Sequence, residues 1–402
     1  MLKVLAKSGV GAAIAPSLRL PAWRWLFPLA ALHAALMPAL SLLALYHGWE
    51  GLQLGSPAAH AREMLFGFAL AVIAGYLLGP VPWRQLLLLT ALWLVGRLGV
   101  LDWPGAVATA LADGVFAGWV AVRLVPRFRS AKKWRNRLLS PLLGMLCLLA
   151  MVTLTWRYLD DMPTTAPLMH QGVLWLVLLM TFMGGRVISP AVNGHLMSQH
   201  RLAGRGVQPR IEATLIVLLG LAAFLAPWQV LHPLAAWLLL VAGLLVLWRI
   251  LRWAPMRRAT RPDLQGLMLG YIWIAIGLWL LARSWWMPTH ASTALHAFTI
   301  GALGTLASSV MLRHVILRAK QHPEREGLLL PLAGLFAVAA MLRLWAIHAG
   351  NGWLWLLWIS AAAWGLGWLL VARRLCVWIG LVDRVNVGRR LPREPAKLDP
   401  GQ

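Results

Sequence analysis

Two histidines stand at the starts of long apolar segments, where an imidazole could bind a metal ion. His60 opens HAREMLFGFALAVIAGYLLG, and His296 is the second residue of LHAFTIGALGTLASSVMLRH. Imidazole is a ligand for copper and iron, although a histidine at a membrane surface can equally remain hydrated without a metal. If both segments are membrane helices that run in the same direction, the two imidazoles lie at the same depth. The sequence therefore predicts a shared site for His60 and His296 near the outer membrane surface.

The residues that follow His60 favour a polar face on its helix. His60, Glu63, Met64 and Gly67 have the i, i+3, i+4 and i+7 spacing that places side chains on one side of an α-helix. An ionisable group in a membrane helix is a candidate functional residue, although the helix dipole alone also favours a carboxylate at this position.

Other histidines and methionines fall near the same predicted surface. Imidazoles suit copper and iron, and thioethers suit Cu(I). The histidines predicted there are His47, His60, His170, His232, His290, His296 and His348. The corresponding methionines are Met64, Met162, Met169 and Met287.

The segment 295–314 carries small residues at helical spacing. The residues close to one face are Ala297, Gly301, Thr305 and Ser308, and Gly304 lies beside them. Such a face lets another helix or a flat cofactor approach the backbone closely. We expect this face to pack near the helix that begins at His60.

Charged residues within or beside apolar segments are further candidates. Asp113 lies near the middle of an apolar segment, and Arg97 on the preceding segment is its expected partner. Arg186, in MGGRVISPAVNGH, could hold an anionic group such as a propionate or a lipid phosphate. Asp160 and Asp161 form an acidic pair in a predicted outer loop, either as a metal site or as part of a solvated loop.

The composition places these residues in an integral membrane protein. The chain has 402 residues, of which 60% are hydrophobic and 12% charged, and its mean hydropathy is +0.70. A soluble protein of this size could not cover so much apolar surface. The net charge of +24 is explained by basic loops on one membrane side, so no nucleic-acid partner is expected. Cys147 and Cys376 lie in apolar runs and indicate no disulfide framework.

Twelve apolar segments are candidates for crossing a bilayer, which takes about 20 residues. They are 22–46, 63–81, 84–101, 104–125, 138–158, 167–187, 210–227, 229–248, 263–283, 291–312, 327–348 and 353–381. With the N-terminus inside, 32 of the 37 Lys and Arg residues fall on the inner side, as the positive-inside rule requires. The five exceptions are Arg62, Arg97, Arg157, Arg283 and Arg343. We therefore predict an all-α, polytopic membrane protein with twelve transmembrane helices and cytoplasmic N- and C-termini.

The domain organisation follows from these segments. A basic N-terminal arm (1–21) precedes a single twelve-helix membrane domain (22–381), and a basic C-terminal tail (382–402) follows it. The basic run RFRSAKKWRNR (127–137) is either a topology determinant or a binding site for anionic lipids of the bilayer.

Four segments resemble signature segments of the NnrS family. They are HAREMLFGFALAVIAGYLL (60–78), LWLVGRL (92–98), MGGRVISPAVNG (183–194) and HAFTIGALGTLASSVMLR (296–313). Weaker similarities between and beside them extend the resemblance over nearly the whole chain. Members of this family are bacterial inner-membrane proteins with twelve helices that contain haem and copper, and they are associated with the response to nitric oxide. The resemblance therefore implies a role in defence against nitrosative stress, with haem and copper as cofactors.

The resemblance also implies roles for individual residues. His60 and His296 are the expected axial ligands of a haem or ligands of a metal. Glu63 is expected to orient an imidazole by a hydrogen bond. Arg186 and Arg313 are expected to be structural or to hold an anionic group.

The chain departs from the family pattern at three histidine positions. Arg62 stands where the motif around His60 usually has a second histidine, and Met268 and Arg318 stand where two further histidines are usual. Arginine does not ligate a metal, whereas Met268 can serve as a soft metal ligand. One expectation is therefore a divergent member with altered or lost metal binding.

Two other function classes fit parts of the sequence. The main alternative is a secondary transporter of a small solute, because twelve helices with both ends inside are common in such carriers. Against it, the sequence has no repeated halves and few intramembrane charges beyond Asp113 and Glu63. A haem–copper oxidase would need several histidines deep within helices, and only His33 is predicted to lie deep within one. The sequence resolves no catalytic constellation, so a conventional enzyme is not predicted.

Overall fold

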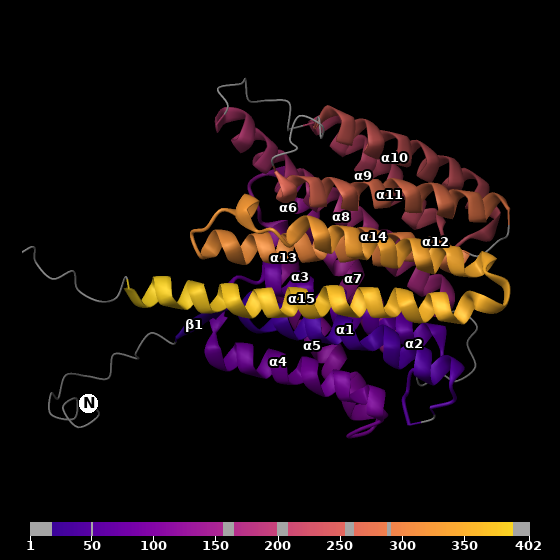
Figure 1. The fold of residues 1–402 in the computed structure, drawn as a ribbon, viewed down its shortest axis with the longest axis horizontal. Helices are drawn as coiled ribbons and strands as arrows, with labels where there is room; N and C mark the ends of the chain where they lie inside the picture. Colours follow the sequence, from indigo (N-terminus) through magenta and orange to yellow (C-terminus); the bar gives the residue numbers. More distant parts are fainter. Residues whose placement is uncertain are drawn as a thin grey trace, which may run out of the picture.

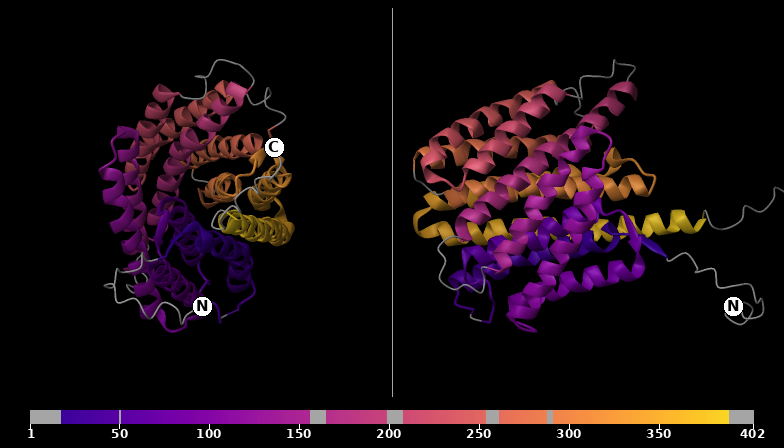
Figure 2. Two further views of the ribbon diagram at one scale, coloured as in Figure 1. Left: turned by 90° about the vertical axis from the view of Figure 1, so that its left-hand side faces the viewer. Right: turned by 180° about the vertical axis from the view of Figure 1, so that it is seen from behind.

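The structure, a computed structural model, describes residues 18–49, 51–155, 165–198, 208–253, 261–287 and 291–388. Nearly all of this chain is helical, and most of the long helices run roughly along one axis of the molecule (Figure 1). Figure 2 adds two further views, in which early and late helices of the chain pack against one another. A hydrophobic core that extends from Ala22 to Val382 joins these helices into one body.

The described elements occur in the following order along the chain. The first part comprises β1 (Arg19–Pro21), α1 (Trp23–Tyr46), α2 (Pro57–Arg62), the π-helical η1 (Glu63–Ala69), α3 (Leu70–Leu77), β2 (Pro80–Pro82), α4 (Trp83–Leu98), η2 (Gly99–Leu101), α5 (Ala106–Arg129), α6 (Trp134–Arg137) and α7 (Leu139–Thr155). The second part comprises α8 (Thr165–Ser198), α9 (Pro209–Leu225), η4 (Gln229–Leu231), α10 (His232–Arg252), α11 (Pro262–Trp286), α12 (Ala291–His296), the π-helical η6 (Ala297–Ala302), α13 (Leu303–Arg318), η7 (Pro323–Arg325), α14 (Leu329–Trp345), η8 (Ala346–His348), η9 (Gly350–Gly352) and α15 (Trp353–Gly388). Regular structure thus continues past the predicted membrane domain (22–381) at both ends.

Ten helices of the described chain are long and apolar enough to cross a membrane, which supports a multi-pass membrane protein. Each of the twelve predicted segments contains a helix. However, α7 and α9 have only 17 residues each within the described ranges and are not among the ten. The all-helical prediction is therefore confirmed, and the count of twelve crossings stays a prediction.

The two ends of the described chain lie at the same end of the bundle. β1 and β2 form a short antiparallel ribbon. Arg24 at the start of α1 forms an ion pair with Asp383 near the end of α15. Arg127 donates to the carbonyl of Leu77 at 2.8 Å, which places the start of the basic run 127–137 at this end too. The membrane side that this end faces stays a prediction.

The small residues of η6 and α13 face large aromatic side chains. Gly301 lies against the Trp273 ring of α11, and a Cβ on Gly304 would lie 2.7 Å from the Trp364 ring of α15. The elements that pack most extensively on η6 and α13 are α11, α14 and α15. The aromatic rings of α11, α14 and α15 thus fill the space that the small residues leave. The expected packing near the helix of His60 is limited to a smaller contact between α13 and α3.

This packing predicts a large effect of one added methyl group. Gly301→Ala is expected to destabilise the protein by about 1–3 kcal/mol, because the new methyl would overlap the Trp273 ring. The midpoint of thermal unfolding in detergent measures the effect. Gly334→Ala in α14 is the matched control, since nothing lies within 4 Å of its Cβ position. Equal midpoints for the two variants would show that the glycine of η6 is not packed as described.

Candidate functional site

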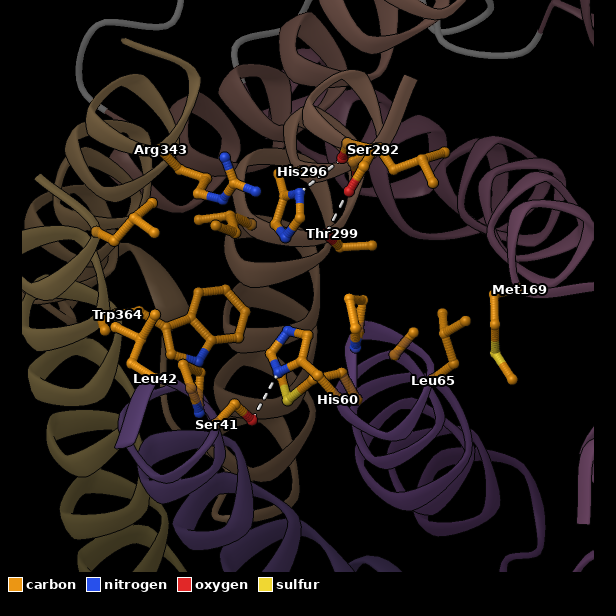
Figure 3. Close-up of a pocket in the computed structure, with 18 of the residues that line it drawn as sticks. Ser41, Leu42, His60, Leu65, Met169, Ser292, His296, Thr299, Arg343 and Trp364 are labelled. Carbon is orange, nitrogen blue, oxygen red and sulfur yellow. Dashed lines mark hydrogen bonds between the residues drawn. The ribbon is translucent and has the colours of Figure 1, made fainter. Parts of the chain in front are cut away.

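A cavity of about 370 Å³ lies toward the end of the bundle opposite the β1–β2 ribbon. Helices from both halves of the chain line it, namely α1, α2, η1, α8, α12, η6, α13, α14 and α15 (Figure 3). Its lining is mostly apolar and includes Leu65, Leu303 and Trp364. A concave, mainly apolar cavity of this size with a few polar side chains is typical of a small-molecule site.

His60 enters this cavity from α2. The side chain of Ser56 caps that helix, and Pro57 occupies its first position. The Ser41 hydroxyl of α1 donates to the carbonyl of Met37 at 2.7 Å. Its oxygen is therefore left to accept from Nδ1 of His60, at 2.9 Å. In the neutral imidazole the proton is then on Nδ1, and the lone pair of Nε2 is free.

His296 enters the cavity from the last residue of α12. Its Nδ1 lies 2.8 Å from the carbonyl oxygen of Ser292. Because a carbonyl only accepts, Nδ1 must carry the proton and Nε2 the lone pair in the neutral ring. Figure 3 shows the second ring nitrogens of His60 and His296 pointing into the space between the two rings. The structure thus brings the two predicted histidines together in one cavity.

A π-helical segment follows each of these histidines. η1 begins at Glu63, less than one turn after His60, and η6 begins directly after His296. π-helical turns within α-helices are rare and occur frequently at functional sites. A π-helical segment also changes the directions of the side chains that follow it. Regular α-helical spacing therefore does not place the residues after η1 and η6 correctly. Nothing in the residue pattern signalled either segment.

Three further side chains with metal-binding atoms line the cavity. They are Met64 of η1 and Met169 and His170 of α8. Thioether sulfur suits Cu(I), and imidazole suits copper and iron. Among the described residues, no three His, Cys, Asp or Glu side chains come together as a metal site. A copper site in the cavity would therefore need the thioethers of Met64 and Met169.

Arg343 of α14 also lines the cavity. It is not among the site residues predicted from the sequence. A signal was nevertheless present, because Arg343 lies in an apolar segment away from the basic inner side, where a charged residue usually has a function.

A comparison with known protein families identifies the chain. The model of the NnrS protein matches residues 18–380 of the 402 residues. The chain belongs to the NnrS family. The matched region contains all of the residues that line the cavity. No curated protein and no solved structure shows significant similarity to the chain.

Glu63 of this NnrS protein does not line the cavity. Its carboxylate and that of Asp113 both form ion pairs with the guanidinium of Arg97. Its Oε2 also lies 3.6 Å from Nε2 of His33. The expectation that Glu63 orients an imidazole of the shared site is corrected, because it belongs to this buried network instead. The expected pairing of Arg97 with Asp113 is present.

The remaining predicted site residues lie apart from the NnrS cavity. Arg313 forms an ion pair with Asp263 and lies about 25 Å along the helix from His296. Arg186 donates to the side chain of an asparagine in α6. Met268 of α11 is only 2% exposed and does not line the cavity. None of the three side chains lies in the cavity with the two histidines. The sequence could not reveal this, because residue order along a helix does not show which end or face meets the cavity.

Two alternatives from the sequence are not resolved by the NnrS structure. Asp160 and Asp161, the predicted acidic pair, lie outside the described residues. Asp113, one of the few intramembrane charges weighed for the transporter alternative, is engaged with Arg97. Transport of a small solute stays a prediction.

The donor set of the NnrS cavity fits a haem group. Two imidazoles direct their Nε2 lone pairs into one space, where they would hold a haem iron. The apolar lining suits a macrocycle, and Trp364 offers a flat aromatic surface. The cavity residues therefore fit the group that the family resemblance implies.

Proposed function

We propose that this NnrS protein binds haem in the cavity through Nε2 of His60 and Nε2 of His296, and that it acts in defence against nitric oxide. One observation carries the proposal: the two imidazoles have their Nδ1 atoms occupied by Ser41 and by the Ser292 carbonyl. Haem held in this way would supply an iron centre at which nitric oxide takes the place of one of the two imidazoles.

The residues of the chain would orient the two imidazole rings and surround the bound group with apolar side chains. The Ser41 hydroxyl and the Ser292 carbonyl hold the two rings in the tautomer that presents Nε2, and such hydrogen bonds also raise the basicity of a ligand. Leu65, Leu303 and Trp364 would give a ligand between the rings an apolar lining. An apolar surrounding of this kind tunes the redox potential of a bound iron.

Copper is the second metal that the cavity favours. Met64 and Met169 place thioethers in the same cavity as His60 and His170, and soft thioethers select Cu(I) over harder cations. Metal analysis should therefore count copper as well as iron.

The protein purified from its membrane tests the proposal directly. We expect a Soret band and about one iron per chain, because the cavity offers one pair of opposed imidazoles. Purified protein with neither a Soret band nor bound copper would remove the cofactor from the proposal and leave the family membership intact.

Ser41→Ala should weaken haem binding without removing a ligand. Loss of the hydrogen bond to Nδ1 frees the His60 ring to rotate and to change tautomer. We expect haem affinity to fall about 10–100-fold in a titration followed at the Soret band. Ser360→Ala is the matched control, because Ser360 lines the same cavity but donates to the Ala339 carbonyl. Equal affinities for the two variants would contradict the role given to Ser41.

The proposal extends to the location of the protein. We infer that it resides in the bacterial inner membrane with the β1–β2 ribbon on the cytoplasmic side, where exposed Lys132 and Lys133 meet anionic lipids. Reporter fusions to the C-terminus test this orientation: an active cytoplasmic reporter supports it, and an active periplasmic reporter contradicts it.

A further inference from the structure

Arg343 is a cation without a protein counter-ion in the described structure. It lies in α14, within a helix that is apolar enough to cross a membrane. Other arginines in the bundle have carboxylate partners: Arg97 pairs with Glu63, Arg249 with Glu212, and Arg313 with Asp263. Among the described residues Arg343 forms no ion pair and no hydrogen bond to any side chain or carbonyl.

The position of Arg343 connects this charge with the cavity. The residue lines the same cavity as His60 and His296. In Figure 3 its side chain extends from α14 toward His296. Arginines near helix ends often extend to the lipid headgroups instead, and the direction of this side chain argues against that arrangement.

A half-buried guanidinium in apolar surroundings is stabilised by an anion. A carboxylate suits it best, because the planar guanidinium can donate two parallel hydrogen bonds to the two carboxylate oxygens. The rest of the lining is mainly apolar, with two imidazole nitrogens facing each other. The complementary ligand is therefore an apolar body that carries a carboxylate at the Arg343 side and accepts nitrogen ligands.

We propose that Arg343 binds a carboxylate of the cavity ligand, which for haem is a propionate group. This inference rests on the proposed haem function and assigns to Arg343 the anion-holding role that was expected of Arg186 and Arg313. Those two arginines are engaged elsewhere, with an asparagine of α6 and with Asp263.

The test compares haem with its dimethyl ester, in which both propionates are blocked. Full-length protein is produced without a haem supply, and each porphyrin is titrated in while the Soret band is followed. The variants are Arg343→Gln, which removes the charge, and Arg343→Lys, which keeps the charge but loses the bidentate geometry. Arg283→Gln is the matched control, since Arg283 is exposed on α11 and does not line the cavity.

The wild-type protein and Arg283→Gln should bind haem at least about tenfold more tightly than the diester. Arg343→Gln should bind both porphyrins with the affinity that the wild type has for the diester, and Arg343→Lys should be intermediate. Unchanged diester binding by Arg343→Gln also shows that the variant is folded.

Two outcomes would overturn the inference while sparing haem binding. One is equal affinity of the wild type for the two porphyrins. The other is a preference for haem that persists in Arg343→Gln, as expected if the guanidinium meets a lipid phosphate instead. If the wild type binds neither porphyrin, the proposed function fails and the inference fails with it.

Discussion

Replacing His296 with alanine is expected to lower haem affinity by more than about a hundredfold. A hydrogen-bond partner of a metal ligand is commonly worth 10–100-fold in affinity, and loss of the ligand itself should exceed that range. His60→Ala should have a similar effect, because the two imidazoles line the same cavity with equivalent hydrogen bonds at Nδ1. Titration of haem into each purified variant, followed at the Soret band, measures the loss.

His348→Ala provides the comparison for these two variants. His348 follows α14 in the short η8 segment, is exposed, and does not line the cavity. Its replacement should leave haem affinity within about twofold of the wild type, since surface changes away from a site usually have small effects. Retention of wild-type affinity by both His60→Ala and His296→Ala would place the haem elsewhere.

Replacing Arg97 with methionine is expected to destabilise the fold by about 3–5 kcal/mol. Arg97 lies between the carboxylates of Glu63 and Asp113, and its side chain is only 10% exposed. Its loss would leave two buried carboxylates without their counter-ion, which is far more unfavourable than a missing contact. The yield of folded protein and the midpoint of thermal unfolding should both fall.

A compensating variant separates charge from packing at this network. Adding Glu63→Gln and Asp113→Asn to Arg97→Met removes the unpaired charges, so much of the lost stability should return. Arg123→Met is the matched control, because Arg123 is an exposed arginine of α5 that contacts Gln85. If Arg97→Met were no less stable than Arg123→Met, the buried network would not hold η1, α4 and α5 together.

The sequence predicted the helical membrane architecture because apolar segments and basic loops report directly on the bilayer. Each predicted segment contains a helix. It also predicted that His60 and His296 lie at one level, since helices of the same direction must place corresponding residues at equal depth. Both residues line one cavity, and the depth of that cavity in the membrane stays a prediction.

The positions of the other site residues depend on how each helix is rotated about its own axis, which residue spacing does not determine. The i, i+3 spacing placed Glu63 on the side of the helix that carries His60, whereas its carboxylate faces Arg97. Met268 is a predicted soft ligand at the position of a missing histidine, but it is buried and does not line the cavity. Arg343 was missed because a single arginine in an apolar segment does not reveal which neighbours surround it.

The central claim is that Nε2 atoms of both His60 and His296 bind one haem iron, and electron paramagnetic resonance of the ferric protein tests it most directly. Two axial imidazoles give a strong ligand field, so the wild type should show a low-spin signal. His60→Ala and His296→Ala, loaded with excess haem, should each show a high-spin signal, because one axial ligand is missing. A high-spin wild type, or a low-spin signal that persists in both variants, would contradict the claim.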